Sequence, residues 1–253
     1  MEVDLLVTAA MVFGRIAGLL AGMPLISSNG VPRSAQMLTA IALTVLVAPG
    51  VGIVSSPSLG ELGLALAGKL LLGSIMGLAL RTVFSASTLA SELLSMEIGL
   101  GLASVLDPVQ KSNSGLLGVL ASWLSGLAFL GLGLHRQCIE IVAASFSVAP
   151  AGMIGNPAAT TEQLVEAVAM TLSLGVQLAG PVLALVWSIN VLIALIAKLA
   201  PKMNMFFSIG LTATSTAGIL MFGVALPWFV AAHISALTEM VQGLQQIVLA
   251  AGP

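Results

Sequence analysis

Long uncharged stretches alternate with short polar breaks along this chain of 253 residues. A helix needs about 20 mainly apolar residues to cross the hydrocarbon core of a bilayer. Four stretches meet this requirement clearly, and they cover residues 35–54, 116–134, 167–197 and 206–230. Two more, 5–26 and 59–80, are apolar apart from Arg15 and Lys69. The pattern therefore predicts about six membrane-spanning helices.

The breaks between these stretches carry clusters of turn-forming Ser, Asn, Gly and Pro, as at residues 27–32 and 55–57. A transmembrane β-barrel would instead show segments of about 10 residues with alternating polarity. The apolar runs here are continuous, rich in Leu, Ala and Gly, and contain no Tyr for an aromatic girdle. We therefore expect an all-α membrane protein, with residues 1–253 forming one domain.

The composition supports a membrane environment and excludes some partners. Hydrophobic residues make up 58% of the chain and charged residues 7%, whereas a soluble domain carries roughly 25% charged residues. The net charge of -2 provides no basic patch for nucleic acid. Lipid is therefore an expected partner, and nucleic acid is not.

Basic residues gather in alternate predicted loops, which indicates an orientation. With six spans, one side of the membrane receives Arg33, Arg81, Lys111, Lys198 and Lys202. The other side receives only Arg136. Because cytoplasmic loops carry an excess of Lys and Arg, the pattern predicts that both termini are periplasmic.

Glycines recur once per turn in the first and third predicted helices. The first helix carries Gly14, Gly18 and Gly22, and the third carries Gly73 and Gly77. Such small-residue stripes let a second helix approach closely. The neighbour is either another helix of this chain or a partner subunit, and the sequence favours neither.

Four ionisable residues fall where the pattern predicts membrane depth, namely Arg15, Lys69, Glu92 and Glu97. Ionisable groups there are costly, and they usually face a bundle interior or a water-filled path. Pairing with an acidic group or snorkelling to the interface is the common outcome for basic residues. We treat all four as candidate buried charges.

Residues 81–115 differ from an ordinary loop. An apolar run leads to the glycines at 99 and 101, then to Asp107-Pro108 and a polar stretch at 110–115. Irregular backbone at membrane depth is tolerated where it is buried in protein or lines a cavity. This stretch is therefore either a re-entrant, pore-lining plug or a plain cytoplasmic loop after a helix that continues from the third span.

Candidates for catalysis or metal binding are weak. His135 and Cys138 are two potential metal ligands without a further pair, and His233 stands alone in an apolar run. Serine-nucleophile, nucleotide-binding and metalloprotease motifs are missing from the sequence. We expect no enzymatic activity, no metal and no cofactor.

Three stretches together resemble the FliR family of flagellar type III export gate proteins, called SctT in injectisomes. They are residues 15–33, with Arg15 and Pro32-Arg33; residues 96–108, from Met96-Glu97 to Asp107-Pro108; and residues 199–206, with Ala200-Pro201 and Asn204. Ser145-Phe146, followed by Pro150, also fits the family. The resemblance covers nearly the whole chain.

The resemblance implies helical hairpins that join FliP and FliQ subunits in a helical, pore-containing assembly of the bacterial inner membrane. FlhB would associate with its cytoplasmic side, and unfolded flagellar proteins would leave the cytoplasm through the pore. Residues 99–115 are similar to the family's plug loop. In that loop, Gly99 and Gly101 would permit tight turns, and Asp107 and Pro108 would fix the exit of the loop. The polar residues Lys111, Ser112, Asn113 and Ser114 would face the lumen of the pore.

A stand-alone secondary transporter or small-solute channel is the alternative. In that case Arg15, Lys69 and Glu92 would be substrate or ion ligands. Transporters commonly contain internal repeats with broken helices in corresponding halves, and the sequence shows no convincing repeat. A transporter would be stable alone, whereas an export gate subunit would need FliP and FliQ.

Overall fold

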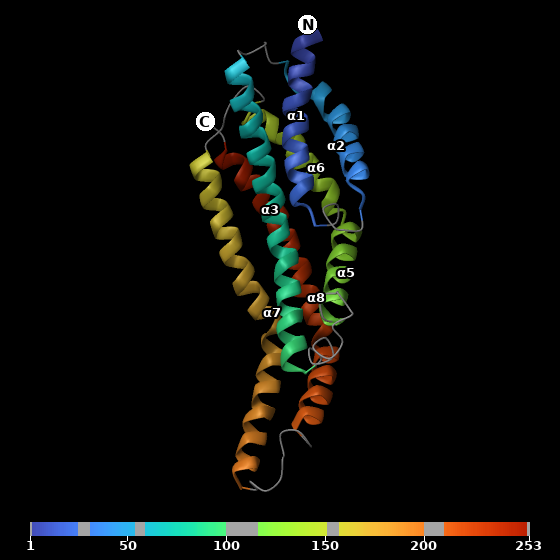
Figure 1. Ribbon diagram of the computed structural model, residues 1–253, viewed down its shortest axis with the longest axis vertical. Helices are drawn as coiled ribbons and strands as arrows, with labels where there is room; N and C mark the ends of the chain where they lie inside the picture. Colours follow the sequence, from blue (N-terminus) through green and yellow to red (C-terminus); the bar gives the residue numbers. More distant parts are fainter. Residues whose placement is uncertain are drawn as a thin grey trace. The chain divides into compact units, whose positions relative to one another are not determined.

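The computed structural model describes residues 2–24, 31–53, 59–99, 116–150, 157–199 and 210–251. All regular secondary structure in these ranges is helical. The α-helices in chain order are α1 (Glu2–Gly22), α2 (Arg33–Val47), α3 (Leu59–Glu97), α5 (Leu116–Gly131), α6 (Leu134–Val148), α7 (Pro157–Leu199) and α8 (Leu211–Ala250) (Figure 1). The prediction of an all-α chain is confirmed.

Among the residues that the structure describes, four helices are long and apolar enough to cross a membrane. They contain the segments Val3–Gly22, Gly60–Glu97, Val168–Leu199 and Leu211–Leu249. Helices α5 and α6 pass the same test together but are bent at the break between them, so they count as at most one further span. The chain is a multi-pass membrane protein with four to five candidate spans, where the sequence pattern predicted about six.

Helix α2 is shorter than the predicted second span at 35–54. It ends at Val47, and a single 3₁₀ turn, η1 (Ala48–Gly50), follows it. Pro49 has no N–H to donate to the preceding turn, so the α-helical hydrogen bonding stops there. At 1.5 Å per residue, the 15 residues of α2 span about 22 Å, which is less than the roughly 30 Å of the hydrocarbon core.

Helices α3, α7 and α8 are longer than the predicted spans. Helix α3 contains 39 residues and continues past residue 80 to Glu97, because residues 81–97 include neither Gly nor Pro. Helix α8 contains 40 residues, continues beyond the predicted span at 206–230 and includes Pro227. Proline is tolerated inside membrane helices when the freed backbone groups find other partners.

Contacts divide the chain into two compact units. Unit 1 comprises Met1–Val83, Phe129–Met170 and Ala236–Pro253, and unit 2 comprises Phe84–Ala128 and Thr171–Ser235. Helix α3 therefore contributes its first part to unit 1 and its second part to unit 2. Within unit 1, α1 lies beside α2 (Figure 1).

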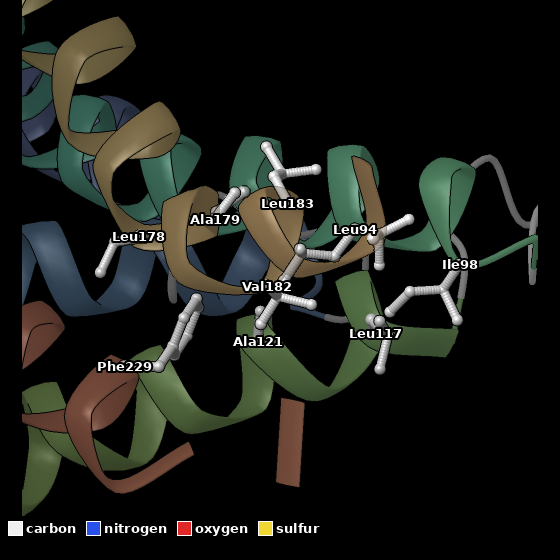
Figure 2. Packing of buried hydrophobic residues seen from close by; sticks show 11 residues of the cluster. Leu94, Ile98, Leu117, Ala121, Leu178, Ala179, Val182, Leu183 and Phe229 are labelled. Atoms are coloured by element: carbon white, nitrogen blue, oxygen red, sulfur yellow. The ribbon is translucent and has the colours of Figure 1, made fainter. Parts of the chain in front are cut away.

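The core of unit 2 is a cluster of buried apolar side chains from α3, α5, α7 and α8. Figure 2 shows Leu94 of α3 and Ile98, the residue after α3, directed toward Leu117 of α5. Val182 of α7 and Phe229 of α8 belong to the same cluster. This core is relevant to function because it contains residues on both sides of the predicted plug loop.

Candidate functional site

The glycine stripes of α1 and α3 face each other. A Cβ atom added to Gly18 would lie 2.6 Å from the carbonyl oxygen of Leu70, and one added to Gly77 would lie 2.5 Å from that of Leu19. A Cβ on Gly22 would meet the backbone of Gly77. These distances leave no room for a side chain, so the two backbones are in direct contact. The neighbour of the α1 stripe is α3 of the same chain.

The two ends of this stripe differ. A Cβ on Gly73 would meet the carbonyl oxygen of Arg15, so this position also requires glycine. A Cβ on Gly14 would lie 3.8 Å from the carbonyl oxygen of Leu66, an ordinary contact distance. The close approach of the two backbones therefore begins at Arg15, the residue after Gly14, and places Arg15 next to α3.

Arg15 is completely buried and binds the end of α6. Its Nη1 donates to Ser145 Oγ and its Nη2 to the Ala149 carbonyl, each at 2.7 Å. Its Cζ lies 3.9 Å from the centroid of the Phe146 ring, in the range of a cation–π interaction. The guanidinium is thus held by three residues from one turn of α6 and its C-cap.

Lys69 of α3 is also buried and binds the next carbonyl along the chain. Its Nζ donates to the carbonyl oxygen of Pro150 at 2.6 Å. The last carbonyls of a helix lack partners within the helix, and the C-terminal end of the helix dipole attracts cations. Arg15 therefore satisfies the carbonyl of the α6 C-cap, Ala149, and Lys69 satisfies the carbonyl of the residue that follows it.

Arg15 has no acidic partner among the residues that the structure describes, and its Nε has no hydrogen bond. Its charge is balanced by neutral oxygen acceptors and an aromatic ring. The sequence suggested an ion path, an acidic partner or snorkelling for Arg15 and Lys69, and the structure places both against backbone carbonyls. Glu92 and Glu97 lie on the unit 2 part of α3, where both are half-buried.

A second constellation forms where α3 ends. The N–H of Ile98 donates to the carbonyl of Leu94 at 2.9 Å, and that of Gly99 donates to the carbonyl of Met96 at 3.1 Å. Gly99 has φ 85°, in the left-handed region that favours glycine. The helix thus terminates in a turn that only glycine adopts without strain.

Helix α8 contacts this turn. Ser215 Oγ donates to the Ile98 carbonyl at 2.6 Å. A Cβ on Gly99 would lie 3.0 Å from Leu211 Cδ1 and 3.3 Å from Ser215 Oγ. A Cβ on Gly218 would lie 2.6 Å from Ile98 Cγ1. The first two turns of α8 therefore pack tightly on the last residue before the predicted plug loop.

Comparison with known proteins identifies the family. The family model for bacterial export proteins, family 1, matches residues 6–240. The chain belongs to this family. The resemblance predicted from the residue patterns is thereby confirmed.

Several curated relatives of this export protein have the name flagellar biosynthetic protein FliR. The protein of Caulobacter vibrioides is 28% identical over 230 residues, which cover 87% of this chain and 90% of that protein. The protein of Escherichia coli K12 is 27% identical over 216 residues, covering 84% and 82%. The protein of Pectobacterium carotovorum is 28% identical over 218 residues, covering 85% and 82%.

Most of the predicted plug lies outside the described residues. Of the residues singled out there, the structure describes Gly99; those outside it are Gly101, Asp107, Pro108, Lys111, Ser112, Asn113 and Ser114. The roles of these residues stay predictions.

Three further candidates from the sequence do not form a site together. His135 is exposed, whereas Cys138 is a buried free thiol. His233 is buried, and neither of its ring nitrogens has a hydrogen-bond partner. Within the described ranges no group of three or more potential metal ligands occurs.

Sequence reasoning missed Ser215 and Gly218 of α8, and it missed the contact between Arg15 and α6. A signal for the second contact was present, because Ser145-Phe146 and Pro150 were among the residues that carried the family resemblance. These are the residues that receive Arg15 and Lys69. The sequence pattern did not show that Ser145, Phe146 and Pro150 interact with Arg15 and Lys69.

Proposed function

We propose that this export protein forms, with FliP-type and FliQ-type subunits, the pore through which unfolded flagellar proteins leave the cytoplasm. Its family and its relatives make it a component of the flagellar export apparatus. The observation that carries the proposal is the family match, which extends over residues 6–240 of a multi-pass helical chain. An FlhB-type subunit would bind on the cytoplasmic side.

Residues 99–115 are the plug of this pore in our proposal. Two features of the described residues support it. Ile98 and Leu117, which flank the segment, belong to one buried cluster, so the segment begins and ends in the same core. Gly99 adopts a backbone conformation that turns the chain away from α3. The polar residues from Lys111 to Ser114 would then face the lumen and help to close it.

The protein would lie in the bacterial inner membrane with both termini periplasmic. The basis for this orientation is the distribution of Lys and Arg among the loops of the six-span sequence pattern. An even number of spans, such as the four that the described helices provide, also places both termini on one side.

The transporter alternative is disfavoured by two of the three residues that it proposed as ligands. Arg15 and Lys69 are buried and donate to carbonyls of the Ala149–Pro150 segment. A substrate would have to displace these hydrogen bonds and break the end of α6. A role in holding helices together accounts for both residues without a substrate.

Co-purification tests the proposed assembly. The chain is expressed with and without its FliP and FliQ partners, and the detergent-solubilised product is analysed by native mass spectrometry. A heteromeric complex that contains this chain is the expected result. A stable monomer or homodimer that ignores both partners would return the transporter as the better hypothesis.

Deletion of the loop tests the plug. Cells carrying the complex without residues 100–115 should take up a small membrane-impermeant dye faster than cells with the intact complex. Co-purification of the deleted chain with its partners serves as the control for assembly. An intact permeability barrier in an assembled deletion complex would refute the plug.

A further inference from the structure

Helix α7 carries an exposed amide side chain within a long apolar stretch. No charged residue lies between Glu166 and Lys198, and the candidate span Val168–Leu199 has a mean hydropathy of 2.3. At 1.5 Å per residue, Gln177 lies about 16 Å along the helix from Glu166 and about 32 Å from Lys198. The hydrocarbon core is about 30 Å thick. Any placement that keeps both charges outside the core therefore leaves Gln177 inside it or at its edge.

The amide of Gln177 is incompletely satisfied. Its Nε2 donates to Ser173 Oγ at 2.9 Å, and both side chains are exposed. Among the described residues, none donates a hydrogen bond to its Oε1. Lipid tails provide no donor either, and an amide that enters an apolar medium without its hydrogen bonds is costly. The side chain therefore requires a donor that the described residues do not supply.

Pro181 adds a second acceptor at the same place. It lies inside α7, and it has no N–H to donate to the backbone carbonyl of Gln177, one helical turn earlier. Pro181 is exposed and lies on the same side of the helix as Gln177. Prolines in membrane helices are tolerated where other groups satisfy the freed backbone. Gln177 thus offers two carbonyl oxygens, one of its side chain and one of its backbone, to a hydrogen-bond donor.

The surface that continues from Gln177 has room for a close neighbour. Ala184 and Ser188 follow on the same side of α7, about two and three turns later, and both are exposed. We call Gln177, Ala184 and Ser188 the Gln177 face. Trp187 and Leu192 lie on either side of it, with exposed fractions of 55% and 58%. The face is therefore small and polar, and its borders are large and apolar.

We propose that the Gln177 face binds a membrane-spanning helix of another subunit of the export complex, and that this helix places an amide or hydroxyl donor against Gln177. The inference rests on the proposed export function. Membrane helices associate through close packing at small residues and through hydrogen bonds of Ser, Thr, Asn and Gln. Lipid does not fit this face, because it has no donor for either carbonyl of Gln177.

A second copy of this chain fits the face less well than a different subunit. In a symmetric pair, each Gln177 has two amide N–H groups, and one of them already donates to Ser173. The remaining N–H can serve one carbonyl of the other copy but not both. A different subunit has no such restriction on the number of its donors.

Dissociation of the purified export complex tests the role of the amide. Gln177→Met keeps the length of the side chain and removes its donor and its acceptor. The concentration at which half of the complex dissociates should rise by about threefold to fifteenfold, the loss expected for one interhelical hydrogen bond in a membrane protein. Native mass spectrometry of a dilution series measures this concentration. An unchanged value would overturn the inference.

Gln137→Met is the matched control. Gln137 is exposed on α6 beside Arg136, whose side chain is 81% exposed, so the same change there removes an amide from a polar surface. It should not change the dissociation of the complex. Equal weakening by Gln137→Met and Gln177→Met would overturn the inference, because the effect would not be specific to the Gln177 face.

A photoactivatable diazirine amino acid in place of Ala184 identifies what covers the face. Illumination of the purified complex should give an adduct with the mass of this chain plus one other subunit. An adduct of two copies of this chain, or adducts with lipid alone, would overturn the inference.

Assembly separates this inference from the proposed function. A chain that forms no complex with FliP-type and FliQ-type subunits would refute both. If a complex forms, but Gln177→Met leaves its dissociation unchanged and residue 184 gives no adduct with another subunit, the docking face alone fails and the proposed pore stands.

Discussion

A buried cation in a membrane protein needs partners, and Arg15 shows that they need not be acidic. Two neutral oxygens and the face of Phe146 take the place of a carboxylate. Because the carbonyl of Ala149 lies at the C-terminal end of α6, the partial negative charge of that end contributes as well. At the residue scale, the hydrogen bond that stabilises the charge of Arg15 also caps the C-terminal end of α6.

Replacing Arg15 should therefore loosen α6 from α1. Hydrogen bonds inside membrane proteins contribute about 0.6 kcal/mol on average and up to about 1.7, so the loss of two bonds and a cation–π contact predicts about 1–3 kcal/mol for Arg15→Gln. Arg15→Lys should lose less, but it cannot reach both acceptors with one planar group. Unfolding of the purified complex in an SDS titration measures the difference.

Arg136→Gln is the matched control for this experiment. Arg136 pairs with Glu140 on the surface of α6, and its side chain is 81% exposed. Exposed pairs of this kind contribute little to stability, so the SDS midpoint should not move. If Arg15→Gln and Arg136→Gln gave the same midpoint, the contacts of Arg15 with Ser145, Phe146 and Ala149 would not stabilise the protein.

At the element scale, helix α3 is defined by what packs on it. In unit 1, helix α1 packs against its glycines. In unit 2, helix α8 packs against Ile98 and Gly99, which directly follow α3. Glycine is unfavourable inside a helix by about 1 kcal/mol relative to alanine. Gly73 and Gly77 are retained in α3 because the backbone of α1 occupies the space that a side chain would need.

Gly73→Ala tests the packing of α1 on α3. The new methyl group would meet the Arg15 carbonyl, and overpacking of this kind costs about 1–3 kcal/mol. Gly63→Ala on the same helix adds a methyl group where nothing lies within 4 Å, so it has the gain in helix propensity without the clash. The two variants should shift the thermal stability of the purified complex in opposite directions.

The break between α5 and α6 depends on a single glycine. Gly133 has φ 67°, and a residue with a side chain costs about 1–2 kcal/mol in the left-handed conformation. Gly133→Ala should therefore lower the yield of folded protein extracted in mild detergent, measured by size-exclusion chromatography. Gly131→Ala, two residues earlier and with no atom within 4 Å of the new methyl group, should leave the yield unchanged or raise it. Equal yields would mean that the break does not require this conformation.

The sequence predicted elements better than their ends and contacts. Apolar runs located the helices because burial in lipid requires them. The predicted second span continued to residue 54, whereas α2 ends at Val47, two residues before Pro49. Pro227, in contrast, lies inside α8, because a proline that stops a soluble helix is tolerated in a membrane helix. The partners of Arg15 could not be predicted because Ser145 lies 130 residues away in the sequence. The local pattern of apolar residues contains no information about contacts between such distant residues.

The same limit applies to the residues that directly follow α3. Gly99 was singled out from the sequence as a turn glycine, and its positive φ agrees with that role. Ser215 lies 117 residues from Ile98 and has the appearance of one more small polar residue in an apolar helix. Only the fold shows that it holds the end of α3.

At the scale of the whole molecule, the two compact units and the multi-pass fold have consequences for topology. Four of the described helices are long and apolar enough to cross a membrane, and large apolar side chains such as Leu172, Trp187 and Val224 are exposed. These surfaces require lipid or other subunits around them. A subunit of a membrane-embedded export assembly would have both lipid and partner subunits around these surfaces.

The orientation of the chain is testable with reporter fusions in living cells. If both termini are periplasmic, alkaline phosphatase fused after residue 253 should be active, and green fluorescent protein at the same place should be dark. A fusion in the segment that contains Lys202 should show the reverse pattern, because the basic residues near it favour the cytoplasm. The pair of sites serves as an internal control, since a failure of expression would silence both reporters. Fluorescence at residue 253 would place the C-terminus in the cytoplasm and refute the predicted orientation.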